Sequence, residues 1–157
     1  MKRLRYSVAL ALAVLAVARS AAAQRPITVT GLQSLAFGTL LPGVPTTISR
    51  TDPVRSGQFL LTGPHNSQAS LVFTLPPALV GPGGALLPLV FGGGDAGYSQ
   101  SLSIASQVGF DPRQRFVLTL SQRGSGSVFL GGAAQPTPTQ RAGAYTATII
   151  LTVATYP

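Results

Sequence analysis

The stretch Gly143–Pro157 has the most regular pattern in the 157-residue chain. Its apolar side chains recur at every second position, at Tyr145, Ala147, Ile149, Leu151 and Val153. The positions between them are mostly threonines, and Tyr156 is the last residue but one. Because successive side chains of a strand point to opposite faces, this alternation predicts a long strand with one face in a core. A shift by one residue would turn that face to solvent, so we expect a central strand that sets the register of the sandwich.

Short segments of the same type recur along the rest of the chain, separated by glycine and proline. They span residues 27–30, 34–40, 46–49, 58–62, 70–75, 86–91, 115–120 and 127–130. No long window has the spacing of an amphipathic helix. Residues 98–110 are ambiguous, and the Gly/Pro-rich residues 131–139 predict a linker. Short strands at fairly regular spacing predict an all-β fold, an antiparallel β-sandwich of about 8–10 strands.

The first residues have the organisation of a secretory signal peptide. Basic residues precede the apolar run Tyr6–Ala18, and Ala21–Ala23 offers a small-residue cleavage site. We therefore expect residues 1–23 to be removed from an exported protein of the periplasm, the cell surface or the extracellular space. The apolar run is short for a membrane span, which needs about 20 residues. An uncleaved N-terminal anchor is the alternative.

Removal of the signal peptide leaves one domain by size. We expect an N-terminal extension or first strand at residues 24–33 and a β-sandwich domain at residues 34–157, with no membrane span. The chain has no cysteine. No disulfide can therefore constrain its unfolded state, and its stability must come from packing or from strands shared between chains.

The formal net charge of +8 says little about partners, because four of the eleven basic residues lie in the signal segment. Residues 24–157 contain seven arginines and three aspartates, with no lysine and no glutamate. The arginines are scattered along the chain. A nucleic-acid site would instead show clustered basic residues with interleaved aromatics, so we expect no nucleic-acid partner.

The residue types needed for catalysis are scarce. Gly92–Gly97 has the glycine spacing of a dinucleotide-binding loop, but that site also needs a following helix and an acidic residue about 20 positions on. His65 is the single histidine, and a metal site needs several ligands. Catalytic carboxylates, or the acid of a Ser-His-Asp triad, could come only from Asp52, Asp95 and Asp111. We therefore expect no enzyme and no cofactor; calcium held by Asp95 and backbone carbonyls is the alternative.

Three parts of the chain carry recognisable motifs. Leu35–Leu40 has the order Leu-x-Phe-Gly-Thr-Leu and is followed by Pro-Gly. Phe59–Gly63 and Leu71–Pro76 form a middle motif, and Leu130–Val153 joins a Gly-Gly pair to the alternating stretch. These motifs resemble those of secreted bacterial pilin-like domains, namely the spore-coat-protein-U domain, which also forms archaic chaperone–usher pilins, and a related exported domain of unknown function. The resemblance covers most of residues 27–157.

The resemblance implies an immunoglobulin-like sandwich that lacks its final strand. A periplasmic chaperone, or the N-terminal extension of a like subunit, donates that strand by β-strand addition. In pilins of this kind the last strand has an upstream glycine and a penultimate tyrosine, which correspond to Gly143 and Tyr156. Ile27 and Val29 would then belong to the donor strand. The extension is short for a donor, and the alternative is that Ile27–Thr30 pairs within its own domain.

Two functions follow as hypotheses. The first is a non-enzymatic structural or surface protein, a pilin-like (fimbrial) subunit or assembly domain that acts through β-strand pairing. The second is a small secreted module that binds carbohydrate or another surface ligand, with contacts from Asn66, Tyr98 and Gln100.

Overall fold

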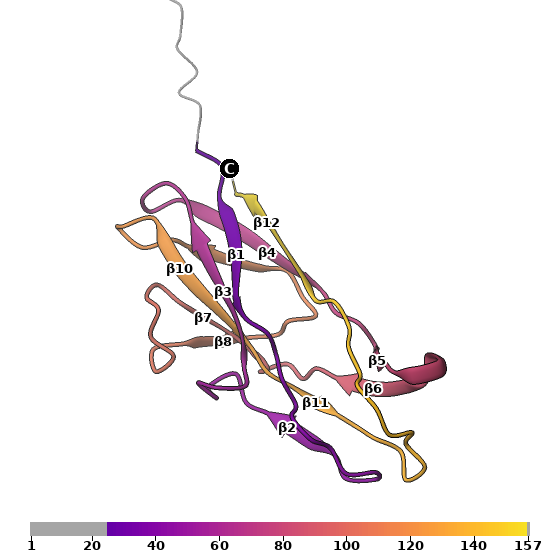
Figure 1. The fold of residues 1–157 in the computed structure, drawn as a ribbon. Helices are drawn as coiled ribbons and strands as arrows, with labels where there is room; N and C mark the ends of the chain where they lie inside the picture. The colour runs from indigo at the N-terminus through magenta and orange to yellow at the C-terminus, as the bar shows by residue number, and fades with distance from the viewer. Residues whose placement is uncertain (1–24, 157) are drawn as a thin grey trace, which may run out of the picture.

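The computed structural model describes residues 25–156, which form an all-β structure (Figure 1). The predicted signal peptide at residues 1–23 lies outside the described residues. The strands are β1 (Thr28–Gln33), β2 (Thr46–Ile48), β3 (Gly57–Thr62), β4 (Gln68–Thr74), β5 (Ala78–Val80), β6 (Leu86–Val90), β7 (Ala96–Ser99), β8 (Val108–Phe110), β9 (Phe116–Thr119), β10 (Ser125–Leu130), β11 (Gly132–Ala134) and β12 (Ile150–Thr155). One 3-10 turn, Pro82–Gly84, joins β5 to β6. None of the described helices is long and apolar enough to cross a membrane.

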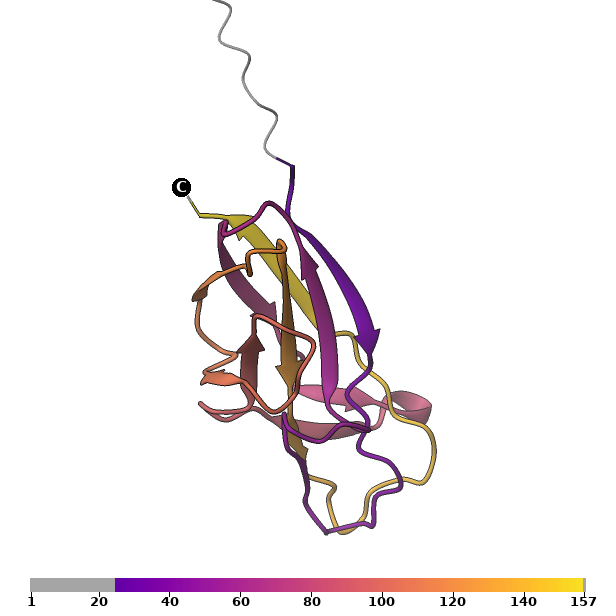
Figure 2. The same cartoon turned by 90° about the vertical axis from the view of Figure 1, so that its left-hand side faces the viewer.

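The strands pair antiparallel in three sheets, which is consistent with the predicted sandwich. The five-stranded sheet has the order β1-β3-β10-β7-β8, the three-stranded sheet β12-β4-β9, and the four-stranded sheet β2-β11-β6-β5. In the view of Figure 2, the strands of the first two sheets flank a common interior. Only Gly131 separates β10 from β11, so one stretch of chain passes from the five-stranded to the four-stranded sheet. A Cβ there would lie 2.7 Å from the Arg50 backbone nitrogen, so glycine permits the close approach of β2.

A row of phenylalanine rings joins the facing sheets. Phe110 of β8 stacks on Phe116 of β9 with ring centroids 4.1 Å apart. Phe73 of β4 lies 6.5 Å from Phe110 and 5.8 Å from Phe59 of β3. Leu61, Val128 and Leu130 are completely buried in the same core. Each buried side chain of this size contributes about 1.5–3 kcal/mol to folding, and this packing takes the place of disulfides.

The C-terminal strand differs from the prediction in length and position. β12 begins only at Ile150, and it is an edge strand that pairs with β4 alone, so the expectation of a long central strand was wrong. The predicted core face is present except at Ala147, which is exposed. Tyr145, Ile149, Leu151 and Val153 are partly buried and pack against the core, whereas the residues between them are exposed.

Two further predictions need correction. Residues 34–40 were expected to form a strand, but they are irregular in the structure, with Gly38 at φ 72°. The predicted linker at residues 131–139 contains β11, which pairs with both β2 and β6. Four short strands outside the predicted segments, β5, β7, β8 and β11, raise the number of described strands to twelve, above the predicted range.

Candidate functional site

One border of the sandwich is left open between its two terminal strands. Among the described strands, β1 pairs only with β3, and β12 pairs only with β4. The two strands are close together without forming a ladder, as the indigo and yellow arrows of Figure 1 show. Each therefore presents a free edge, and free edges are the places where another strand can pair.

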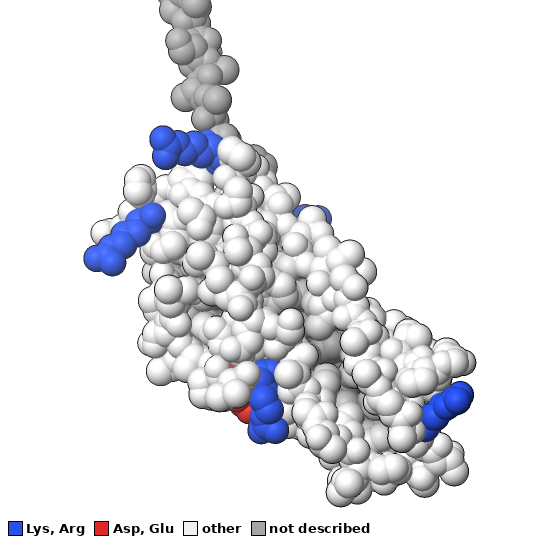
Figure 3. Space-filling view, viewed as in Figure 1, with Lys and Arg blue, Asp and Glu red and all other residues white. Residues whose placement is uncertain are grey.

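A groove continues from this border along the molecule. It lies between residues 31–42, which comprise the end of β1 and the segment after it, and residues 140–149, which lead into β12. We call it the edge groove. Its larger part, with a volume of about 770 Å³, lies between residues 34–42 and 140–147. A smaller part of about 270 Å³ adjoins it and reaches Ile149. The hollow is visible in the lower half of the face drawn in Figure 3.

The chain on both sides of the edge groove has unpaired backbone. On one side, Ala36 donates its N–H to the Arg55 carbonyl (2.9 Å), and residues 37–40 have no backbone hydrogen bonds within the described chain. On the other side, the same holds for residues 147–149. N–H and C=O groups are obligatory hydrogen-bonding groups, so these segments are left to pair with water or with an added strand.

Apolar side chains line the edge groove. The lining includes Leu35, Phe37, Leu40, Phe59, Leu79, Leu87, Tyr145 and Ile149. All of them belong to the hydrophobic core or pack against it. A strand laid into the groove would therefore extend the core, because its inward side chains would cover apolar surface that now faces water.

One wall of the groove is organised around Gln140. Its Nε2 donates to the Leu86 carbonyl (3.2 Å) and to the Tyr145 hydroxyl (2.7 Å), and its Oε1 accepts from the Thr137 N–H (3.2 Å). The Tyr145 hydroxyl in turn donates to the Arg141 carbonyl (2.7 Å). These bonds fix the segment before β12 although it belongs to no sheet. Gln140 lies within the Leu130–Val153 motif, but the sequence prediction gave it no functional role.

The same wall rests on the β5–β6 hairpin. Val80 and Thr146 exchange two backbone hydrogen bonds, of 2.8 and 3.0 Å. The Tyr145 ring lies directly on Gly81, where any Cβ would collide with it. Gly143 has φ 147° and packs against the Pro82 ring, so glycine is required there by both conformation and space. The sequence-predicted residues Gly143 and Tyr145 thus belong to the groove wall.

The other predicted assembly residues are more dispersed. Ile149 lines the groove, while Leu151 and Val153 lie in β12 against the core. Tyr156 is 46% exposed, and its N–H donates to the Gln68 carbonyl (3.0 Å).

The candidate donor residues lie within their own domain. Val29 of β1 pairs with Leu61 of β3, and Ile27 packs against the core just before β1. The structure therefore places residues 28–33 in a ladder with their own β3.

The three aspartates cap turns. The backbone N–H groups of Val54 and Arg55 donate hydrogen bonds to the Asp52 carboxylate. These bonds, together with the Arg55 side chain, lower the pKa of Asp52 below its usual value. Asp111 forms an ion pair with Arg113 (2.8 Å), whose hydrogen bonds lower the pKa of Asp111 in the same way. Asp95 accepts from the Gly92 N–H (2.6 Å).

The structure bears on the metal and dinucleotide alternatives. His65 is exposed in the loop between β3 and β4. The Gly92–Gly97 segment connects β6 to β7 and leads into a strand, where a dinucleotide site needs a helix. In residues 25–156 there is no group of three or more His, Asp or Glu side chains that could hold a metal ion.

The residues proposed for a carbohydrate-type site are not all exposed. Tyr98 is only 6% exposed in β7, so its expected place in a binding loop was wrong. Its hydroxyl donates to the Thr119 carbonyl (2.7 Å), and burial raises its pKa to about 12. Gln100 donates to the same carbonyl (3.1 Å), and Asn66 lies in a separate loop at φ 53°.

Comparisons with protein-family models, with curated proteins and with solved structures gave no significant match.

Proposed function

We propose that this chain is an exported, non-enzymatic structural protein with an immunoglobulin-like, pilin-like sandwich. It acts as a subunit or assembly domain through β-strand addition, and the edge groove receives the added strand. Its partners are like subunits or a periplasmic chaperone at the cell surface or in the periplasm.

The observation that carries the proposal is the state of the two segments beside the groove. Residues 34–40 and 143–149 have the alternating sequence of strands, yet neither is part of a sheet. Leu35 and Phe37 of the first segment and Tyr145 and Ile149 of the second pack in or against the core, whereas Ala147 is exposed. Residues 37–40 and 147–149 also lack backbone hydrogen-bond partners among the described residues. One added strand between them would supply partners to both segments at once.

Two proline variants test this mode of binding. Successive N–H groups of an extended segment point to opposite sides, so only one of the Ala147 and Thr148 amides faces the groove. Neither amide has a backbone partner among the described residues, so Ala147→Pro and Thr148→Pro should both fold. We expect a labelled peptide of alternating valine and threonine to bind the wild-type chain and one of the two variants. Fluorescence anisotropy measures binding, and circular dichroism checks the fold.

Equal binding by both folded variants would contradict strand addition at this position.

Export of the protein has a separate test. The chain expressed with residues 1–23 in a bacterium should be recovered from the periplasm, and N-terminal sequencing should begin at Gln24. Retention of the intact N-terminus in the membrane would instead support the uncleaved anchor.

A further inference from the structure

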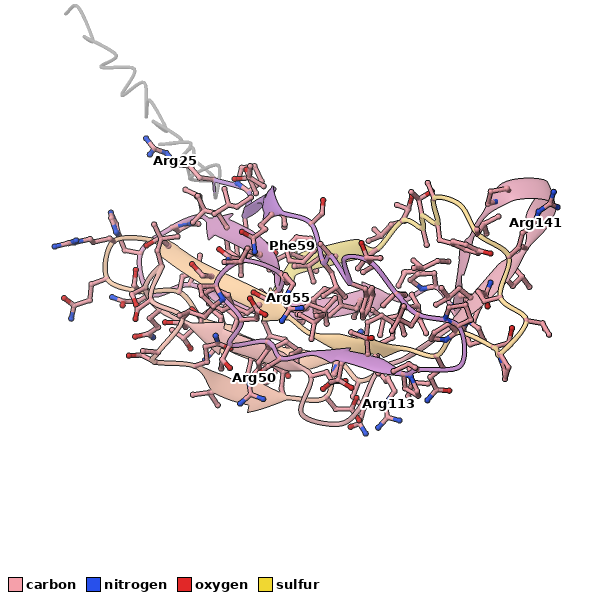
Figure 4. The ribbon with its side chains drawn as sticks, turned by 60° about the horizontal axis from the view of Figure 1, so that its bottom comes forward. Arg25, Arg50, Arg55, Phe59, Arg113 and Arg141 are labelled. Carbon is pink, nitrogen blue, oxygen red and sulfur yellow. The ribbon has the colours of Figure 1, made fainter. Side chains whose placement is uncertain are left out.

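The edge groove carries a single charged side chain. Among the residues that line it there is no aspartate or glutamate, and Arg141 is the only lysine or arginine. Figure 4 shows Arg141 at the β5–β6 hairpin, far along the molecule from the labelled Arg50, Arg55 and Arg113. Its Nη1 would be 2.8 Å from a Cβ at Gly83, so the guanidinium lies over the hairpin turn.

The described chain offers Arg141 no carboxylate. The two ion pairs among the described residues are Arg55 with Asp52 and Arg113 with Asp111. The Asp95 carboxylate accepts a hydrogen bond from the Gly92 N–H. The guanidinium is exposed beside an apolar groove. A strand that covered the groove would remove water from this charge, and an uncompensated charge is costly to desolvate. The occupant should therefore bring an anion to this end.

A second copy of the chain is poorly suited to supply it. Its N-terminal segment at residues 24–33 contains Arg25 and no acidic residue, so it can bring only like charge toward Arg141. That segment is also engaged, because β1 forms a ladder with β3 from Thr28 to Gln33. A donating copy would have to break this ladder before it could pair elsewhere.

We infer that the occupant of the edge groove is an extended apolar strand of a different polypeptide with a carboxylate that faces Arg141. This inference rests on the proposed function, since it names the partner of the same groove. The carboxylate is either an acidic side chain at one end of the strand or the strand's own C-terminus. Arginine suits both, because its planar guanidinium binds a carboxylate through two parallel hydrogen bonds.

Peptide binding to the purified full chain tests the inference. The probes are valine–threonine peptides with Glu or Gln at the N-terminal end, Glu or Gln at the C-terminal end, and a free or amidated C-terminus. The direction of the strand decides which end meets Arg141, so one placement should gain affinity and the other should not. Exposed charged pairs predict a gain of about 1.5-fold to fivefold for that placement. The gain should shrink at high salt.

Variants of the protein test whether Arg141 causes the gain in peptide affinity. In Arg141→Gln the Glu and Gln peptides should bind equally, while Arg141→Lys should retain part of the difference. Arg123→Gln removes a cation from the loop before β10, outside the groove, and should preserve the full difference. If the advantage follows a free C-terminus and not a glutamate, the carboxylate is that of a chain end.

The peptide experiment distinguishes a failure of the proposed function from a failure of the inference about Arg141. If no peptide binds, the groove does not receive strands and the proposed function falls. If peptides bind with equal affinity whatever their charge, only the inference about Arg141 is overturned. It is also overturned if a peptide of residues 24–33 binds as tightly as the best Glu peptide, because a second copy would then be a sufficient partner.

Discussion

Tyr98 places a phenol group inside the sandwich. Its ring covers Gly126 of β10, where a Cβ would lie 2.6 Å from the ring, and its hydroxyl is bonded to the Thr119 carbonyl. An ionised phenolate could not make this bond and would be poorly solvated, which is why burial raises the pKa of Tyr98 to about 12.

The raised pKa has a consequence for stability. The unfolded chain ionises Tyr98 near pH 10, whereas the folded chain does so near 12. The contribution of the neutral phenol is therefore complete below pH 10 and is lost as the pH rises from 10 to 12. We expect Tyr98→Phe to lose about 1 kcal/mol at neutral pH with the hydrogen bond and to show a weaker decline in alkali. Thermal melts of both proteins between pH 8 and 12 measure this; parallel pH profiles would contradict it.

Gly143 combines a left-handed conformation with close contact to Pro82. We expect Gly143→Ala to lower the free energy of unfolding by about 1–3 kcal/mol, because the new methyl group is strained and collides with the ring. Gly31→Ala is the matched control, since nothing lies within 4 Å of a Cβ there. Urea denaturation measures both. Equal stability of the two variants would show that the 140–146 segment moves away from the hairpin easily.

At the scale of elements, β12 shows what an edge position does to a well-patterned strand. Leu151 faces the core, and Thr152 faces the opposite side and is exposed. We expect Leu151→Asp to destabilise the protein by about 2–4 kcal/mol, since it removes packing and brings a carboxylate to the core border. Thr152→Asp should change stability by about 0.5 kcal/mol or less. Urea denaturation separates the two; similar losses would mean that the core face of β12 is assigned incorrectly.

The same strand shows which features of the fold could be predicted from the sequence. The alternation at residues 145–153 correctly predicted that Tyr145, Ile149, Leu151 and Val153 turn inward, because burial imposes a period of two on an extended segment; it was wrong at Ala147, which is exposed. It could not predict hydrogen-bond partners, which come from residues distant in sequence. The wrong strand assignment at residues 34–40 has the same cause. Short strands such as β11 were missed because glycine and alanine carry almost no strand preference.

Throughout residues 25–156, charged side chains lie in turns and loops, outside the strands. The three aspartates each cap a turn, and the face drawn in Figure 3 is mostly uncharged around its hollow. The scarcity of acidic residues and histidine, together with the scattered arginines, led to the expectation of neither catalysis nor nucleic-acid binding. The groove itself was not predictable, because it is assembled from residues near positions 35, 80, 130 and 145 that only the fold brings together.

The free edges of β1 and β12 also determine how the molecule would carry a mechanical load. The start of β1 and the end of β12 lie at the same end of the sandwich (Figure 1). Tension that pulls these two points apart would peel each strand from its single neighbour, breaking hydrogen bonds in succession at low force. A strand seated lengthwise in the groove and pulled along its axis would load many hydrogen bonds together, since they lie perpendicular to the pull. A fibre joined through the groove would resist tension best along its inserted strands.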